Sequence, residues 1–134
     1  GMGKQQSKIV VVENEKEVSL LSKLNAKVMG TDSDPFYGAK TVIVVFSDSE
    51  SHTCVEDGSL IMGNLMNAAH SLGVCSCWIH RAKEVFEFEE GKKLKQKWGI
   101  PESYVGIGHC IIGYTDDAIK QAADRKSDYV VYSE

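Results

Sequence analysis

Short apolar runs recur along the chain and alternate with stretches of helical spacing. The runs are rich in β-branched residues and bounded by turn residues, which is typical of buried strands. They lie at residues 8–12, 41–46, 75–79 and 104–114. A further run at residues 129–132 predicts a last strand, either at an edge of the sheet or on a second copy of the chain.

Three longer stretches predict helices, at residues 15–29, 54–73 and 84–98. In the first, Val18, Leu21 and Leu24 follow a helical spacing, and Gly30 is a typical residue for a helix end. Strands that alternate with helices in this way predict a mixed sheet with helices packed on it, of either the α/β or the α+β class.

The helix at residues 54–73 has a broad apolar stripe that includes Gly58, Gly63 and Ala68. Such small residues let another helix approach closely, so we expect this helix at the centre of the fold. Its wide apolar face also favours a homodimer, because it is more apolar surface than one chain of this size can cover.

Composition narrows the possible functions. With 134 residues, 43% hydrophobic and 25% charged, the chain is expected to form one domain over residues 1–134. A net charge of −4 argues against a nucleic-acid-binding protein, and we interpret the basic stretch at residues 92–97 as a solvated helix face. No apolar run is long enough to span a membrane, and no secretory signal is visible. We therefore expect a cytoplasmic protein with reduced thiols.

The strand at residues 104–114 contains Gly106 and Gly108. A phosphate-binding Rossmann loop would need a third glycine and a strand that runs directly into a helix, and both are missing. Two interpretations remain. Either the glycines let a flat or bulky group approach the strand backbone, or they mark structural bulges.

A metal site is suggested by Cys75, Cys77 and His80, with His109 and Cys110 downstream, but the spacing argues against one. Cys75 and Cys77 would point to the same face of a strand, whereas His80 would point to the opposite face. We predict neither bound zinc nor disulfides. No Ser/His/Asp or Cys/His order indicates a nucleophilic hydrolase, although a general base could be any of the four histidines, His52, His70, His80 and His109. Pattern alone therefore leaves the functional site unidentified.

Five segments, taken together, indicate a function that no single pattern does. They are the loop at residues 34–39, the helix at 55–73, the strand and turn at 76–82, and the segments at 97–101 and 106–114. In this order they resemble segments of the nitroreductase family, whose members are FMN-dependent NAD(P)H oxidoreductases. The resemblance implies an α+β sheet between helices, in an intertwined homodimer with two FMN sites at its interface.

The resemblance also implies where the flavin ring is bound. Trp78, Ile79 and His80 lie where the family places backbone and side chains against the edge of the isoalloxazine ring. Amides there can form hydrogen bonds near flavin N5 and so tune hydride transfer. Gly108 lies in the strand that approaches the cofactor.

Two other segments are implied to bind the rest of the FMN molecule. Gln5, with Gly3 and Lys4 beside it, resembles the end of the first flavin-contacting loop of the family. Arg125 and Lys126 resemble the basic pair that meets the FMN phosphate.

The resemblance implies a ping-pong transfer of electrons from NAD(P)H to a nitroaromatic, a quinone or a similar acceptor, and no catalytic side chain is expected.

The chain departs from the family in lacking its N-terminal arginine-rich motif, so we interpret it as N-terminally truncated. Losing two arginine–phosphate bonds of about 1.5–3 kcal/mol each would weaken FMN binding by roughly 10²–10⁴-fold. The alternative is therefore a homodimeric remnant that is poor in FMN and lacks efficient catalysis.

Overall fold

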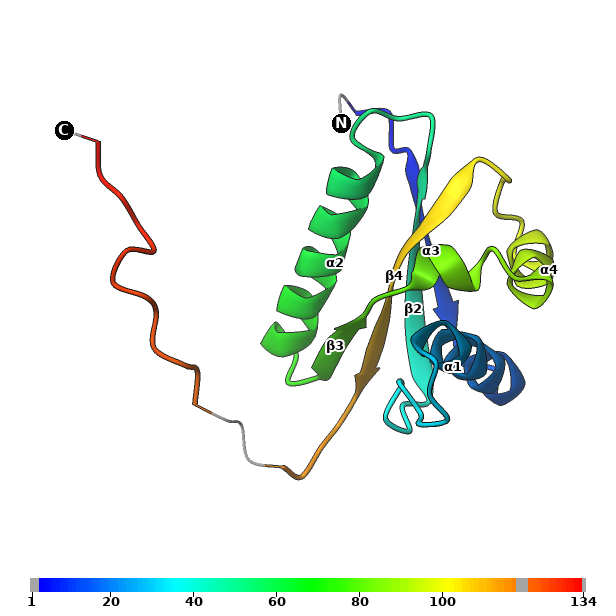
Figure 1. Cartoon of the computed structure of the whole chain (residues 1–134), viewed down its shortest axis with the longest axis horizontal. Coiled ribbons are helices and arrows are strands. Elements are labelled where there is room, and N and C mark those ends of the chain that lie inside the picture. The colour runs from blue at the N-terminus through cyan, green and yellow to red at the C-terminus, as the bar shows by residue number, and fades with distance from the viewer. Residues whose placement is uncertain (1–2, 118–120, 134) are drawn as a thin grey trace.

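The computed structural model describes residues 3–117 and 121–133 and contains a sheet of four strands (Figure 1). The strands are β1 (Ser7–Val12), β2 (Thr41–Asp48), β3 (Cys75–Ile79) and β4 (Tyr104–Gly113). They are arranged in the order β1-β2-β4-β3. Each pairing in this sheet is antiparallel, so the sheet that we expected to be mixed is antiparallel within the described part of the chain.

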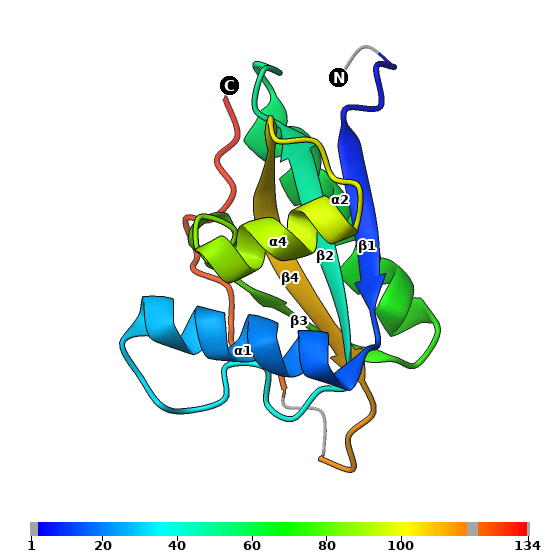
Figure 2. The same ribbon diagram turned by 90° about the vertical axis from the view of Figure 1, so that its right-hand side faces the viewer.

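Helices cover both faces of the sheet, which confirms the α+β class. They are α1 (Glu15–Met29), α2 (Cys54–Ser71), α3 (Ala82–Val85) and α4 (Glu89–Lys97). α2 lies on one face, and α1, α3 and α4 lie on the other (Figures 1 and 2). The helical turns expected at residues 84–98 form two helices, α3 and α4. They approach so closely that a Cβ on Gly91 would collide with the carbonyl of Val85.

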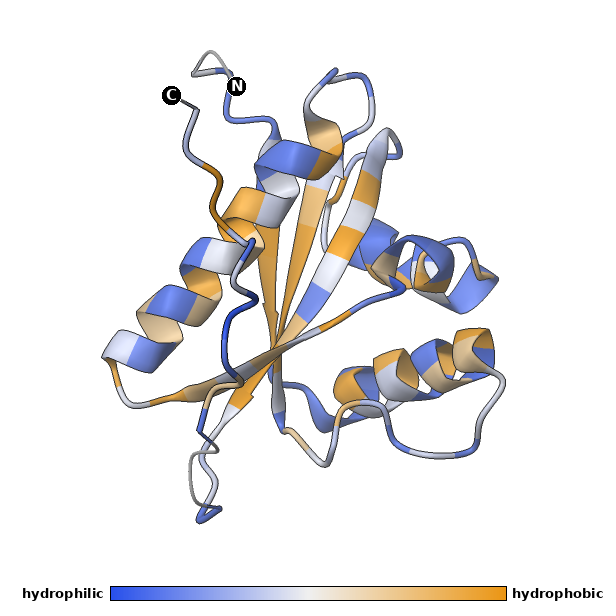
Figure 3. Cartoon of the chain, turned by 60° about the vertical axis from the view of Figure 1, so that its left-hand side comes forward, coloured by the Kyte–Doolittle hydropathy of each residue, from blue (hydrophilic) through white to orange (hydrophobic). Residues whose placement is uncertain are grey.

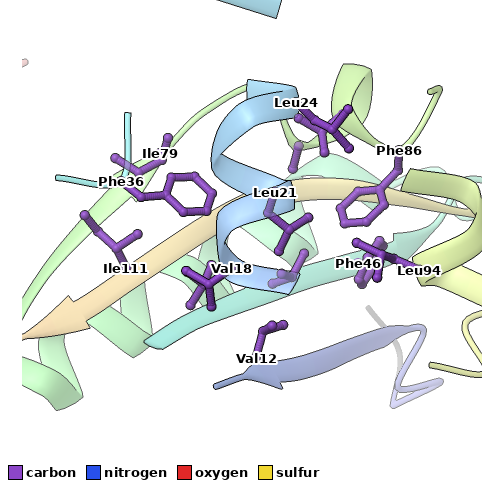
Figure 4. Close-up of a cluster of buried hydrophobic side chains, with 14 of the residues drawn as sticks. Val12, Val18, Leu21, Leu24, Phe36, Phe46, Ile79, Phe86, Leu94 and Ile111 are labelled. Atoms are coloured by element: carbon purple, nitrogen blue, oxygen red, sulfur yellow. The ribbon is translucent and has the colours of Figure 1, made fainter. Parts of the chain in front are cut away.

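The larger core lies between the sheet and the three helices α1, α3 and α4 (Figure 4). Val42, Val44 and Phe46 point into it from β2, because alternate residues of a strand share a face. Leu21 and Leu24 enter it from α1, as their helical spacing predicted.

The smaller core lies under α2 and includes Val45, Met62 and Cys110. Gly58 was expected to admit another helix, but it admits the sheet instead. A Cβ on Gly58 would lie 2.5 Å from Ile107 Cγ1 and 2.9 Å from Ser47 Oγ. The absent side chain thus brings α2 close to the strands, and the central strands are hydrophobic along most of their length (Figure 3).

β1 is an edge strand and not the buried strand that its apolar run predicted. Ile9 and Val11 lie opposite Val45 and Ile43, so they share the α2 face of the sheet. α2 lies over β2, β3 and β4, and Ile9 and Val11 remain 49% and 60% exposed. The run is apolar on both faces, yet one chain covers only one of them.

The C-terminal segment, residues 121–133, is an extended tail that leaves the compact part of the chain (Figure 1). The strand expected at residues 129–132 is not formed within this single chain. Its Tyr129, Val130, Val131 and Tyr132 are all exposed. Among the helices of the described residues, none is long and apolar enough to cross a membrane.

Candidate functional site

The end of β3 brings several of the predicted site residues together. Trp78 and Ile79 pair with Cys110 and His109 of β4. Trp78 packs against the α2 core, while Ile79 is buried on the opposite face. His80 follows them and is exposed. The segment therefore alternates between the two cores and ends at the surface.

Gly108 is in direct contact with Trp78. The indole ring occupies the space that a Cβ on Gly108 would need. Gly106 likewise admits Ala82 and the ring of Phe86. The interpretation that these glycines let a bulky group approach the strand is thus confirmed, with the chain's own side chains as that group. The register shift of β2 against β4 falls between Val45 and Phe46, opposite these glycines, so the strand is irregular there as well.

The indole nitrogen of Trp78 is buried and makes no hydrogen bond within the described structure. A buried donor without a partner costs about 1–3 kcal/mol, so such groups are uncommon outside sites that meet a ligand or water. An acceptor from outside the chain would remove this cost.

The turn after β3 has an unusual backbone. Arg81 has a φ of 72°, in the left-handed region, where a non-glycine residue is strained by about 1–2 kcal/mol. The side chain of Asn25 holds this turn from α1. Its Nδ2 donates to the His80 carbonyl at 2.8 Å, and its Oδ1 accepts from Arg81 Nε at 3.0 Å. Asn25 is fully buried, whereas its two partners lie nearer the surface, so both bonds are partly shielded from water.

His109 is fully buried beside the same turn, between the rings of Phe36 and Phe86 at centroid distances of 5.3 and 6.0 Å. Burial lowers its pKa from 6.5 to about 4, and the positive charge of Arg81 acts in the same direction. The carbonyls of Ile79 and His80 oppose this shift, although neither ring nitrogen makes a hydrogen bond of full geometry. The imidazole is therefore neutral at neutral pH.

The loop before β2 fixes Phe36 against His109. The Asp34 carboxylate accepts hydrogen bonds from Ser22 Oγ at 2.5 Å, from the Phe36 amide at 2.9 Å and from the Gly38 amide at 2.7 Å. Burial alone would raise the pKa of Asp34, but these bonds outweigh it and lower the pKa. The loop is thus tied to α1, which also carries Asn25.

Gly3, Lys4 and Gln5 lie apart from this turn. They precede β1, and β1 and β3 are the opposite edges of the sheet. All three are exposed, and Gln5 has a φ of 51°. Gln5 and Arg81 are thus two of the three described non-glycine residues with positive φ, a conformation that concentrates at functional sites.

Arg125 and Lys126 also lie apart from the turn, on the extended tail. Both are exposed, and the Arg125 guanidinium lies 6.0 Å from the ring centroid of Tyr129. The structure of a single chain thus assembles the residues predicted for the ring edge but not those predicted for the phosphate.

Two open grooves flank the loop at residues 31–40. One, of about 760 Å³, lies between this loop and α1. The other, of about 740 Å³, lies between residues 36–41, the start of β3 and the end of β4. Trp78, Ile79, His80 and Gly108 line neither groove. In one chain, the residues predicted for the ring edge therefore lie outside both grooves.

The cysteines are all free thiols. Cys75 and Cys77 are exposed, whereas Cys54 and Cys110 are buried. Burial raises the pKa of both buried thiols, and nearby carboxylates add to the effect at Cys54. Within the described residues, no group of three or more His, Cys, Asp or Glu side chains could hold a metal ion.

Sequence reasoning missed Asn25 and Arg81 and treated His109 only as one of several histidines. One signal was available for Asn25. It directly follows Leu24, on the apolar side of a helix whose stripe was already recognised. A polar residue at such a position needs a buried partner. The sequence did not say which one.

Comparisons with known proteins agree with this fold. The sequence matches the family model described as the nitroreductase family over residues 1–114. An FMN-bound nitroreductase from Bacteroides fragilis has a similar structure, with a TM-score of 0.87 and 21% identity over 100% of this chain and 79% of that one. An FMN-bound nitroreductase from Desulfitobacterium hafniense has a TM-score of 0.84 and 21% identity, over 100% and 79% of the two chains.

A third similar structure is an FMN-dependent nitroreductase from Clostridium difficile. Its TM-score is 0.79 and its identity 23%, over 100% of this chain and 79% of that one. None of the curated proteins matches the sequence.

Proposed function

Because the chain belongs to the nitroreductase family, we propose that it is an FMN-dependent oxidoreductase. It passes electrons from NAD(P)H to a small acceptor such as a nitroaromatic compound or a quinone. The observation that carries this proposal is the family match over residues 1–114, together with the FMN bound in structures of the same fold. The order is ping-pong, so the donor leaves before the acceptor enters the same site.

The residues at the end of β3 fit the edge of a flavin ring. The turn at His80 reaches the surface, and its left-handed backbone is held from within by Asn25. The buried indole N–H of Trp78 is a donor that has no acceptor within the described structure. FMN supplies the hydride chemistry when it is bound, and the protein contributes position and electrostatics. We assign the ring edge to Trp78, Ile79, His80 and Gly108.

The cations on the other two segments fit the phosphate. Lys4 follows the left-handed Gly3 and precedes Gln5, and Arg125 and Lys126 lie close together on the tail. An arginine guanidinium suits bidentate contact with a phosphate, and a lysine adds a point charge. These cations would have to meet the β3 turn of the same chain or of another one.

A homodimer would bring these parts together. α2 buries only Cys54, Gly58 and Met62 in one chain, while Leu60 is 68% exposed. The exposed apolar residues of β1 lie on the same face of the sheet, and the tail has a hydrophobic stretch near its end (Figure 3). We propose that these surfaces pack against a second copy, with the tail on the partner.

We also propose a cytoplasmic location. The free, exposed thiols of Cys75 and Cys77 favour the cytoplasm, which keeps thiols reduced.

Titration of the purified protein with FMN tests the proposal. We expect flavin absorbance that co-purifies or saturates, and bleaching when NADH or NADPH is added without oxygen. Initial rates against donor and acceptor should then give parallel double-reciprocal lines. A colourless dimer that does not take up FMN would contradict the proposal and favour the alternative, a non-enzymatic homodimer.

A further inference from the structure

Buried polar side chains are few, and two of them meet at one place. In the described residues they are Asn25, Ser47 and His109. Ser47 pairs with Ser7, oxygen to oxygen at 2.7 Å, away from the β3 turn. Asn25 and His109 come from different elements, α1 and β4, and both lie against the backbone between Ile79 and Arg81.

Asn25 uses both ends of its amide on this turn. The Nδ2 bond fixes the direction of the His80 carbonyl, and the Oδ1 bond holds the side chain of Arg81. The His80 carbonyl and the Arg81 N–H share one planar peptide unit. Because the carbonyl points inward to Asn25, the direction of the Arg81 N–H is fixed as well. The strained φ of Arg81 persists because these bonds and the start of α3 over-determine it.

His109 supports the same turn from the sheet. Its ring is packed between Phe36 and Phe86, and its partner in the ladder is Ile79. A neutral imidazole can stay there without a counter-ion, whereas a charged one would be costly so close to Arg81. His109 thus packs beside the turn as a neutral group, held between two aromatic rings.

We propose that Asn25 and His109 are positioning residues for the flavin ring edge. They hold the backbone of Ile79, His80 and Arg81 so that its amides and the His80 side chain face the cofactor. The inference rests on the proposed function. Hydrogen-bond donors at the ring edge stabilise the negative charge of the reduced flavin, and they do so best when they are held in place. Loosening the turn should therefore lower the reduction potential of the flavin.

The test uses Asn25→Leu, which removes both bonds at similar size, and Asn25→Asp, which keeps the acceptor for Arg81 but loses the donor to His80. His109→Phe replaces the ring by an apolar one. The matched control is Ser47→Ala, which removes an equally buried hydrogen bond that does not touch the turn. Each variant is compared with the wild type by amide hydrogen exchange without FMN, by FMN titration and by the FMN midpoint potential.

For Asn25→Leu we expect exchange at Arg81 and Ala82 to accelerate by about ten-fold, and FMN affinity to fall by about ten-fold. Reduced FMN should lose about ten-fold more affinity than oxidised FMN, which lowers the potential by ~30 mV for a two-electron couple. Asn25→Asp and His109→Phe should shift these values in the same direction, and Ser47→Ala should leave them at the wild-type values.

The possible failures are distinct. If the wild type takes up no FMN, the proposed function fails, and the flavin part of this inference fails with it. If the wild type binds FMN but the Asn25 variants keep its affinity and potential, the function stands and the positioning role is wrong. If all variants including Ser47→Ala shift the potential equally, the effect is general loosening of the fold, and the positioning role is again wrong.

Discussion

The indole of Trp78 lies on the backbone of Gly108, in the space that a side chain at position 108 would fill. This contact joins β3 to β4 on the α2 face of the sheet, two positions before the buried Cys110. A strand glycine is usually unfavourable, so its presence here is explained by what it admits.

Gly108→Ala should therefore destabilise the protein by about 1–3 kcal/mol, because the new methyl group would collide with Trp78 Nε1 and the ring would have to shift. Thermal or urea unfolding measures the loss. Gly113→Ala is the matched control on the same strand, since a Cβ there would meet nothing within 4 Å. Equal effects at the two positions would contradict the role of the Trp78 contact.

Acid should destabilise the fold through His109. As the pH falls from 6.5 to about 4, the unfolded chain protonates this histidine while the folded chain does not. The unfolded state then binds more protons, so stability decreases with falling pH in this window, by up to about 3 kcal/mol. Below the folded pKa the loss is complete.

Urea unfolding across this pH range compares the wild type with His109→Gln, which cannot take up the proton. Carboxylates such as Asp34, whose pKa is lowered in the fold, also reduce the stability at low pH, and they do so equally in both proteins. The difference between the two curves isolates His109. Curves that stay parallel would show that its pKa is the same folded and unfolded.

Leu60→Glu should weaken the proposed dimer. Leu60 is a large apolar side chain on the exposed side of α2, and a carboxylate there could not be buried against a second copy without a large desolvation cost. Sedimentation velocity should show dissociation at concentrations where the wild type is dimeric. Gln96→Glu adds the same charge on the exposed surface of α4 and should leave the assembly intact. A wild type that is monomeric at micromolar concentration would refute the dimer.

Arg125→Ala should weaken FMN binding by about ten-fold or more, because a charge-assisted bond to phosphate is worth about 1.5–3 kcal/mol. The stability of the protein without FMN should not change, because Arg125 is exposed on the tail. Fluorescence quenching of FMN measures the affinity, and Lys93→Ala controls for loss of a distant surface cation. If both variants bind like the wild type, the tail does not contact the phosphate.

The hydrophobic pattern predicted most of the elements because their apolar positions are buried. Leu21 and Leu24 of α1 and the apolar run of β2, which is buried on both faces, lie where the pattern required them. The pattern failed at β1, whose run is apolar on both faces. Such a run does not show whether a helix of the same chain or a second chain packs on each face. The pattern predicted helical turns at residues 84–98 but did not separate α3 from α4, since the close approach of Gly91 to the Val85 carbonyl depends on packing that local sequence does not show.

The site was less predictable than the fold. Trp78 and Gly108, which the resemblance assigns to the ring edge, lie in contact across the pairing of β3 and β4. Asn25 lies 55 positions from the carbonyl that it binds. Such a bond depends on how α1 crosses the sheet, which no local pattern records.

The strand pairings of this sheet also set how fast the chain can fold. Every pair of partners in the ladders, from Ser7 and Ser47 to Ile79 and His109, is separated by at least 30 positions, so the described sheet contains no hairpin. No strand can find its neighbour by a local turn, and each pairing must first close a long loop. Refolding from urea should accordingly take roughly milliseconds to seconds, with the helices formed before the sheet. During that interval the apolar strands are open to other chains, which makes dilution during refolding a practical requirement.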